Sequence, residues 1–198
     1  MSWYIPLAVT FTAIFLAELG DKTQLITISL SSKYSHVPVF FGVFLGMGVV
    51  TIIGVFIGTV LFEVVEIMYV KILSGLIFII FGIWTLFSMV KGKEEGEGKD
   101  EVAVKTEEKS IFSTAFIMTS LAEFGDKTQF AVIALTAQYA SPVLVYAGAM
   151  MAFALIIGIG VVLGKKIAEK VSSKWIELCS GVLFIVIGVL FLIEAAFL

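Results

Sequence analysis

The sequence predicts an all-α integral membrane protein with six transmembrane helices, arranged as two three-helix repeats of inverted topology. Of its 198 residues, 60% are hydrophobic and only 15% are charged, whereas roughly a quarter of the residues in an ordinary soluble domain are charged. The mean hydropathy of +1.09 indicates more apolar surface than a chain of this length can bury. We therefore exclude a soluble globule and expect lipid as the solvent.

Six long apolar runs account for most of the chain, and each is long enough for a membrane-spanning helix of about 20 residues. They are residues 3–30, 37–62, 72–90, 111–137, 142–164 and 175–197. No separate soluble domain fits beside them, so any activity is expected within the bilayer. Because no positively charged stretch precedes the first run, we expect no cleaved signal peptide.

The six runs differ in where they carry charge. The second, third and fifth contain no charged residue, which is typical of helices that face lipid or other helices. The sixth has Glu177 near its start and Glu194 near its end, and surface charge is the simplest interpretation of Glu194. The first and fourth runs carry charged residues near their centres, and intramembrane charges are expected to be functional.

Residues 91–110 separate the chain into two halves, 1–90 and 111–198. This segment contains five Lys, seven Asp or Glu and several Gly, a composition that predicts a solvated linker. Lysine counts in alternate loops predict the orientation. Ten lysines fall on the side of the linker, whereas Lys71 alone falls on the other side. We therefore place the linker in the cytoplasm and both termini outside, in a multi-pass protein.

The two halves are copies of each other. Residues 17–25 (AELGDKTQL) recur as residues 122–130 (AEFGDKTQF), identical at seven of nine positions with an offset of 105. Glycine and proline positions elsewhere recur within one residue of that offset. Since each half holds three spans, the halves are expected to cross the membrane in opposite senses, as inverted repeats do.

The repeated motif places carboxylates near the middle of the membrane. An ionised Glu18 or Glu123 there costs several kcal/mol unless it is partnered. On a continuous helix, Asp21 and Lys22 lie three and four residues after Glu18 and so share its face. The pseudo-two-fold axis of an inverted repeat is expected to bring both copies together at one site.

The candidate cation ligands are all oxygen donors. They are the carboxylates of Glu18, Asp21, Glu123 and Asp126, the amide oxygens of Gln24 and Gln129, and the hydroxyls of Thr23 and Thr128. This set suits hard cations, Ca²⁺ and Mn²⁺ better than Mg²⁺. The two motifs contain neither His nor Cys, which argues against Zn²⁺ and Cu⁺. Cys179 is the sole cysteine, so an intramolecular disulfide is excluded.

Two features of the motif leave alternatives open. Gly20 and Gly125 allow either a close helix approach or a local break whose carbonyls become ligands. Lys22 and Lys127 either neutralise a carboxylate in the empty state or reach towards an aqueous vestibule. A purely structural pair of buried salt bridges does not explain why the whole motif recurs, because buried ion pairs stabilise weakly.

Clustered carboxylates in a poorly hydrated place repel one another, which raises their affinity for protons when no metal is bound. Metal and protons then compete for the same oxygens. That competition is sufficient for exchange, in which the cation enters by displacing protons and protons from the other side displace the cation. The sequence therefore predicts cation/proton antiport.

The doubled Glu-x-Gly-Asp-Lys-Thr motif, with the six-helix pattern around it, resembles the calcium/manganese:proton antiporter family. That family includes the Golgi manganese and calcium transporters of eukaryotes and small bacterial manganese exporters. The resemblance covers essentially the whole chain. It implies that the four motif carboxylates bind the transported cation and that Lys22, Thr23, Lys127 and Thr128 complete the two motifs. It also implies a plasma-membrane protein that exports Mn²⁺, with Ca²⁺ as the competing substrate.

Two other functions share the acidic residues. A cation channel would show no uphill transport driven by a proton gradient, and an exporter of small organic cations would need an apolar or aromatic subsite that the sequence does not reveal. An enzyme is not expected, because no nucleophile and base pair is visible. We expect no prosthetic group and no nucleic acid partner, and nothing in the sequence indicates a homo-oligomer.

Overall fold

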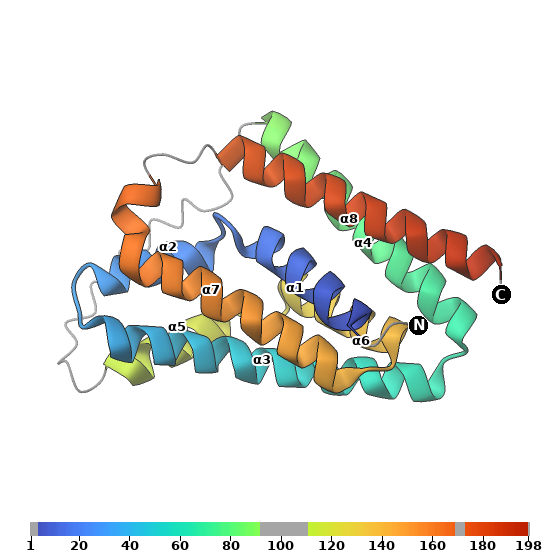
Figure 1. Cartoon of the computed structure of the whole chain (residues 1–198), viewed down its shortest axis with the longest axis horizontal. Helices are drawn as coiled ribbons and strands as arrows, with labels where there is room; N and C mark the ends of the chain where they lie inside the picture. The colour runs from blue at the N-terminus through green and yellow to red at the C-terminus, as the bar shows by residue number, and fades with distance from the viewer. Residues whose placement is uncertain (1–3, 92–110, 169–172, 198) are drawn as a thin grey trace.

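The computed structural model describes residues 4–91, 111–168 and 173–197, and these ranges are helical throughout apart from short turns (Figure 1). The helices are α1 (Ile5–Glu18), α2 (Lys22–Ser31), α3 (His36–Val64), α4 (Ile67–Lys91), α5 (Ile111–Glu123), α6 (Lys127–Tyr139), α7 (Pro142–Ala168) and α8 (Ser173–Ala196). The described ranges contain no strand, which confirms the all-α class. The predicted linker lies outside the described residues except for Lys91 at the end of α4.

Of the two alternatives left open for the motif glycines, the structure shows the local break, because the described part of the chain forms eight helices where six apolar runs were found. The first predicted run is split where α1 ends at Glu18 and α2 begins at Lys22, and the fourth is split at the same place in the motif. The cause is local: Gly20 has a φ of 78° and Gly125 a φ of 79°, a left-handed conformation that glycine adopts without a steric cost. The motif therefore forms a break, and its charged residues do not share one helix face.

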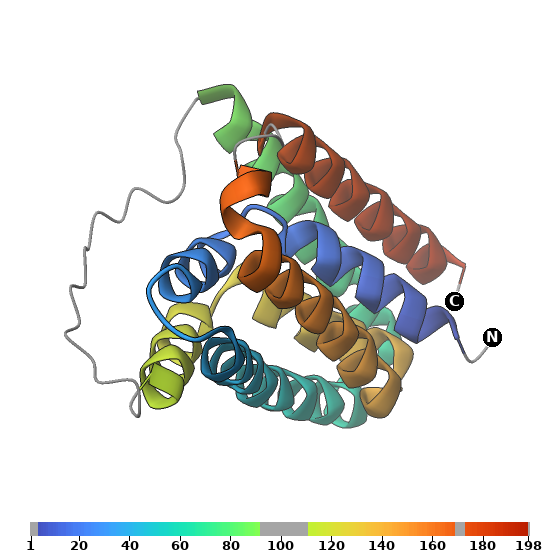
Figure 2. The same cartoon turned by 60° about the vertical axis from the view of Figure 1, so that its left-hand side comes forward.

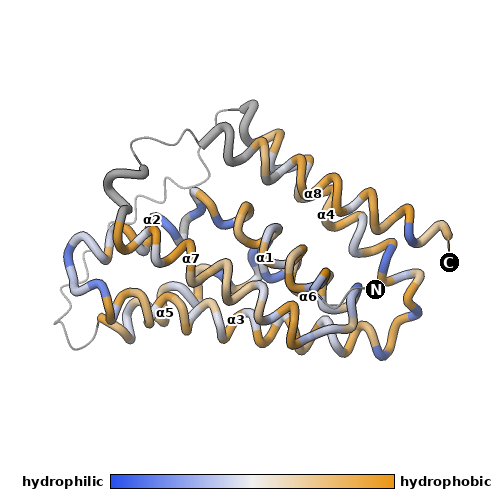
Figure 3. Tube along the Cα trace, in the orientation of Figure 1, coloured by the Kyte–Doolittle hydropathy of each residue, from blue (hydrophilic) through white to orange (hydrophobic). Residues whose placement is uncertain are grey.

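Three helices in the described ranges are long and apolar enough to cross a membrane. They are His36–Val64, Ile67–Phe87 and Pro142–Val162, with mean hydropathies of 2.5, 2.2 and 2.3. Shorter apolar helices cover Ile5–Glu18, Ile111–Glu123 and Gly181–Ala196. Hydrophobic residues predominate along α3, α4 and α8, whereas hydrophilic residues interrupt the trace between α1 and α2 (Figure 3). These helices are those of a multi-pass membrane protein.

Equivalent helices make equivalent contacts in the two halves. Gly42 of α3 lies so close to α5 that a Cβ there would be 2.6 Å from the carbonyl oxygen of Phe112. Gly148 of α7 lies equally close to α1, where a Cβ would be 2.6 Å from the carbonyl oxygen of Leu7. Small residues permit such close helix approach in membranes. α3 and α7 run in opposite directions, and the two ends of the chain lie on the same side of the molecule (Figures 1 and 2).

The last helices of the two halves, α4 and α8, form a tight pair (Figure 2). Gly75 and Gly188 face each other across it, and a Cβ on Gly188 would be 2.6 Å from the carbonyl oxygen of Gly75. The ring of Phe78 packs edge-on against Phe184 and Phe191, with centroid distances of 5.4 and 5.8 Å. The pair rests on the remaining helices through α4 against α6 and α8 against α1.

We expect the Gly188→Ala substitution to destabilise the protein by about 2 kcal/mol, because the new methyl group forces the backbones of α4 and α8 apart. Gly158→Ala is the matched control, since its Cβ would meet only Phe40 Cε2 at 3.9 Å. The thermal unfolding midpoint in detergent measures both effects. A Gly188→Ala midpoint equal to that of the control would contradict the tight pair.

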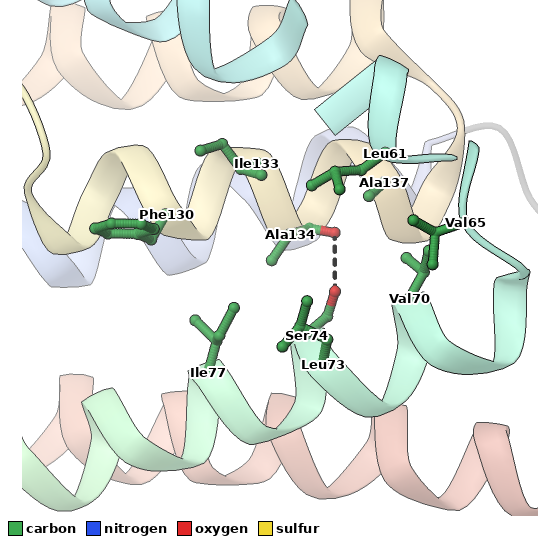
Figure 4. Close-up of a pocket in the computed structure, with 10 residues that line it drawn as sticks. All are labelled: Leu61, Val65, Val70, Leu73, Ser74, Ile77, Phe130, Ile133, Ala134 and Ala137. Atoms are coloured by element: carbon green, nitrogen blue, oxygen red, sulfur yellow. Dashed lines mark hydrogen bonds between the residues drawn. The ribbon is translucent and has the colours of Figure 1, made fainter. Parts of the chain in front are cut away.

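A polar cluster ties α4, α6 and α8 together on the side where the chain ends lie. Lys71 Nζ is 3.0 Å from Glu194 Oε2, and Gln138 Nε2 donates to the same oxygen at 3.0 Å. Beside this cluster, a pocket between α4 and α6 is lined by apolar side chains and by Ser74, which donates to the carbonyl oxygen of Ala134 at 3.4 Å (Figure 4). Such an apolar lining does not suit a cation, so the candidate cation site lies elsewhere.

Candidate cation site

The two helix breaks are held by the same internal hydrogen bond. The backbone N–H of Gly20 donates to Gln24 Oε1 at 2.7 Å, and the backbone N–H of Gly125 donates to Gln129 Oε1 at 2.7 Å. Backbone N–H groups at the start of a helix have no acceptor within that helix. The glycine N–H lies just before the second helix of each pair, and the side chain of the glutamine four residues later is its acceptor. Both amide oxygens therefore fix the breaks in this structure. That Gln24 and Gln129 also bind the cation remains a prediction.

Each motif is bonded to the glutamate of the other motif. Thr23 Oγ1 donates to Glu123 Oε1, and Thr128 Oγ1 donates to Glu18 Oε1. Both glutamates are buried, with 1% of Glu18 and 2% of Glu123 exposed. The hydroxyls that complete the motif thus orient the carboxylates across the two halves, as residues behind a metal ligand commonly do.

Three of the four predicted carboxylates converge. One oxygen each from Glu18, Glu123 and Asp126 lies within 4.8 Å of the others. Asp126 is the N-cap residue of α6 and has an extended backbone, so it lies in the break before that helix. Carboxylates held this close in a buried place repel one another, and a cation or a proton among them relieves the repulsion.

The fourth carboxylate, Asp21, binds a lysine. Lys127 Nζ lies 2.8 Å from Asp21 Oδ2, and the two side chains are 23% and 14% exposed. This ion pair joins the two halves, as the threonine–glutamate hydrogen bonds do. Of the two roles left open for Lys127, the structure shows neutralisation of a carboxylate. The side chain of Lys22 lies outside the described residues.

A small cavity adjoins the site on the side of Glu123. Its other lining residues include Met47 and Thr51 of α3 and Phe153 of α7. Gln129 Nε2 donates to the carbonyl oxygen of Val50 at 3.4 Å, which joins α6 to α3 beside this cavity. Sequence reasoning did not identify α3 as part of the site. The signal available was Thr51, a polar residue in the middle of an apolar run.

The family model of the divalent cation/proton antiporter GDT1 matches residues 6–93 and 111–197, which is most of the chain. The chain belongs to this family. GDT1 is a family of transporters, so the predicted kinship with cation/proton antiporters is confirmed.

Relatives of this GDT1-family chain include proteins of plants and of a cyanobacterium. Protein PAM71, chloroplastic, of Arabidopsis thaliana is 34% identical over 202 residues, an alignment that covers 90% of this chain and 54% of that protein. GDT1-like protein sll0615 of Synechocystis is 32% identical over 189 residues, covering 89% of this chain and 91% of the relative. The chain thus spans about half the length of the plant protein and nearly all of the cyanobacterial one. No solved structure matches the chain.

Proposed function

We propose that this chain is a secondary transporter that exports Mn²⁺ from the cytoplasm in exchange for protons, with Ca²⁺ as the competing substrate. The observation that carries the proposal is the convergence of Glu18, Glu123 and Asp126 at the two helix breaks. Broken helices at an interface between repeats are where secondary transporters bind ions. Membership of the GDT1 family supports the same class of reaction.

The donor set favours the proposed substrates. Carboxylate, amide and hydroxyl oxygens suit Mn²⁺ and Ca²⁺, while a site built without His or Cys suits Zn²⁺ and Cu⁺ poorly. We propose Glu18, Glu123 and Asp126 as the primary ligands. Asp21 is the proposed fourth carboxylate, and Gln24 and Gln129 are proposed to contribute amide oxygens. No prosthetic group is proposed, since the metal is the cargo.

Exchange follows from the shared ligands. A cation and protons both relieve the repulsion among the clustered carboxylates, so each displaces the other. If the site faces one side at a time, a proton gradient then drives the cation uphill. The crossed hydrogen bonds and the Lys127–Asp21 pair join the two halves at the site. Binding of a cation or a proton there therefore changes contacts made by both halves.

We propose a plasma-membrane location, with the linker in the cytoplasm and both termini outside. The lysine excess on the linker side supports this orientation, and the two ends of the chain lie on one side of the molecule (Figures 1 and 2). We further propose that α1 and α2 together cross the membrane once, and that α5 and α6 together also cross it once. Six spans in two inverted repeats then follow, consistent with the opposite directions of α3 and α7.

The decisive experiment is uptake of Mn²⁺ and Ca²⁺ into proteoliposomes, with and without an imposed pH gradient. We expect accumulation above the external concentration only when a proton gradient is present, and faster for Mn²⁺. Flux that follows the metal's own electrochemical gradient would identify a channel instead. Absence of metal flux, together with efflux of a small organic cation, would overturn the metal-transport proposal.

A further inference from the structure

The small cavity beside Glu123 borders the carboxylate cluster. Its volume of about 10 Å³ is enough for one water molecule. Glu123 and Thr128 both line it, and the hydroxyl of Thr128 donates to Glu18 Oε1. A molecule in this cavity would therefore lie beside the carboxylates that we propose to bind the cation.

The lining of this cavity suits water. A buried water molecule needs two to four polar partners, whereas a cavity lined by apolar groups alone stays dry. Four polar side chains line this cavity, and they are Thr51, Glu123, Thr128 and Gln129. All four are buried, with between 2% and 7% of each exposed. We therefore treat the cavity as a site for one water molecule.

The hydroxyl of Thr51 is oriented to accept a hydrogen bond from the cavity. Its single hydrogen is donated to the carbonyl oxygen of Met47 at 2.7 Å. A hydroxyl has one hydrogen and two acceptor lone pairs, so only the lone pairs remain for another partner. The same holds for Thr128, whose hydrogen is donated to Glu18 Oε1. Together with the carboxylate of Glu123, the two hydroxyls surround the cavity with acceptors.

A water molecule that binds a cation needs such acceptors. Its oxygen lone pairs point towards the metal, so both of its hydrogens point away and are donated. Mn²⁺ and Ca²⁺ prefer about six oxygen ligands or more. The converging carboxylates of Glu18, Glu123 and Asp126 bring one oxygen each within 4.8 Å of the others. Three such oxygens leave coordination positions that water can fill.

We propose that the transported cation keeps one water molecule, which occupies this cavity and donates its hydrogens to Thr51 Oγ1 and to the carboxylate of Glu123. Thr51 is then a positioning residue, because it holds the water that touches the cation and does not touch the cation itself. This inference rests on the proposed function. It adds a residue of α3 to a site otherwise built from the two repeated motifs.

Thr59 provides a matched control on the same helix. Its hydroxyl donates to the carbonyl oxygen of Val55 at 2.8 Å, the same bond to the fourth preceding residue that Thr51 makes. Thr59 follows Thr51 by eight residues, about 12 Å along a helix, and it is not among the residues that line the cavity. Replacement of Thr59 by Val therefore removes the bond within the helix and leaves the cavity intact.

The first test measures Mn²⁺ binding by the whole chain in detergent. We expect Thr51→Val, which keeps the shape of the side chain and removes the acceptor, to raise the Kd about tenfold, as loss of a group behind a metal ligand commonly does. Thr51→Ser keeps the hydroxyl and should bind Mn²⁺ as the wild type does. Thr59→Val should also keep the wild-type Kd. Equal Kd values for Thr51→Val and Thr59→Val would overturn the assignment of Thr51.

The second test counts the water molecules on the bound metal. Electron spin-echo spectra of Mn²⁺ bound to the protein in D₂O show modulation from the deuterons of each coordinated water. We expect this modulation in the wild type and in Thr59→Val, and one coordinated water fewer in Thr51→Val. An unchanged water count in Thr51→Val, or no coordinated water in the wild type, would overturn the inference.

The two proposals fail in different ways. If the wild type shows neither Mn²⁺ binding nor proton-driven metal uptake, the proposed function is wrong. If the wild type transports Mn²⁺ while Thr51→Val keeps its Kd and its water count, only the proposed water site is wrong.

Discussion

Glu18→Gln and Glu123→Gln are each expected to reduce proton-driven Mn²⁺ uptake at least 100-fold in proteoliposomes. Gln keeps the size of the side chain and an oxygen able to accept the threonine hydrogen bond, but it removes the charge that attracts the cation. It also removes the group that exchanges a proton for the metal, so both halves of the antiport cycle are lost. Direct Mn²⁺ binding in detergent should weaken in parallel.

The control for these variants is Glu63→Gln, which neutralises an exposed carboxylate at the end of α3. Uptake by this variant should remain within twofold of the wild type, because surface charges far from the site contribute little at physiological salt. Glu18→Gln and Glu123→Gln should both keep the wild-type elution volume in size-exclusion chromatography and so remain folded. Burial of a neutral amide costs less free energy than burial of a carboxylate. Folded Glu18→Gln protein with wild-type uptake would refute the assignment of the site.

The Asp21–Lys127 pair allows stability to be separated from transport. We expect Lys127→Met alone and Asp21→Asn alone each to lower the free energy of unfolding by about 3 kcal/mol, because each removes one charge of a largely buried ion pair. The double variant should recover most of that loss, since it contains neither charge. The thermal unfolding midpoint in detergent measures the stability of all three variants. A loss of stability in the double variant equal to the sum of the two single losses would contradict a direct interaction between Asp21 and Lys127.

Transport should respond differently in the same three proteins. Asp21 is the proposed fourth carboxylate, so the double variant is expected to regain stability while its Mn²⁺ uptake stays at least tenfold below that of the wild type. Recovery of both stability and uptake would show that Asp21 serves only as the partner of Lys127. The proposed site would then consist of three carboxylates.

The crossed contacts explain why the motif occurs twice. Thr23 bonds to Glu123, Thr128 bonds to Glu18, and Lys127 pairs with Asp21. Each motif on its own would leave its glutamate without the hydroxyl that orients it. The two copies therefore build one site between them, and neither half is expected to bind the cation alone.

The sequence by itself determined the membrane class, the duplication and the residues to examine. Apolar composition decides the solvent of the chain, and the repeated AE(L/F)GDKTQ segment identifies the centre of each half. These features depend on composition and on spacings of a few residues, so they can be recognised in the sequence before the fold is known. The same reasoning left open whether Gly20 and Gly125 permit a close helix approach or a local break, and their left-handed backbone shows that both helices break there.

Only the tertiary structure decided which groups meet. Sequence spacing left the partner of Lys127 open, while the fold places it against Asp21, 106 residues earlier. It also places a small cavity, bordered by Met47 and Thr51 of α3, beside Glu123. The physical reason is that hydrogen bonds and ion pairs depend on distances of about 3 Å, and for residues far apart in the chain only the packing of the helices sets those distances.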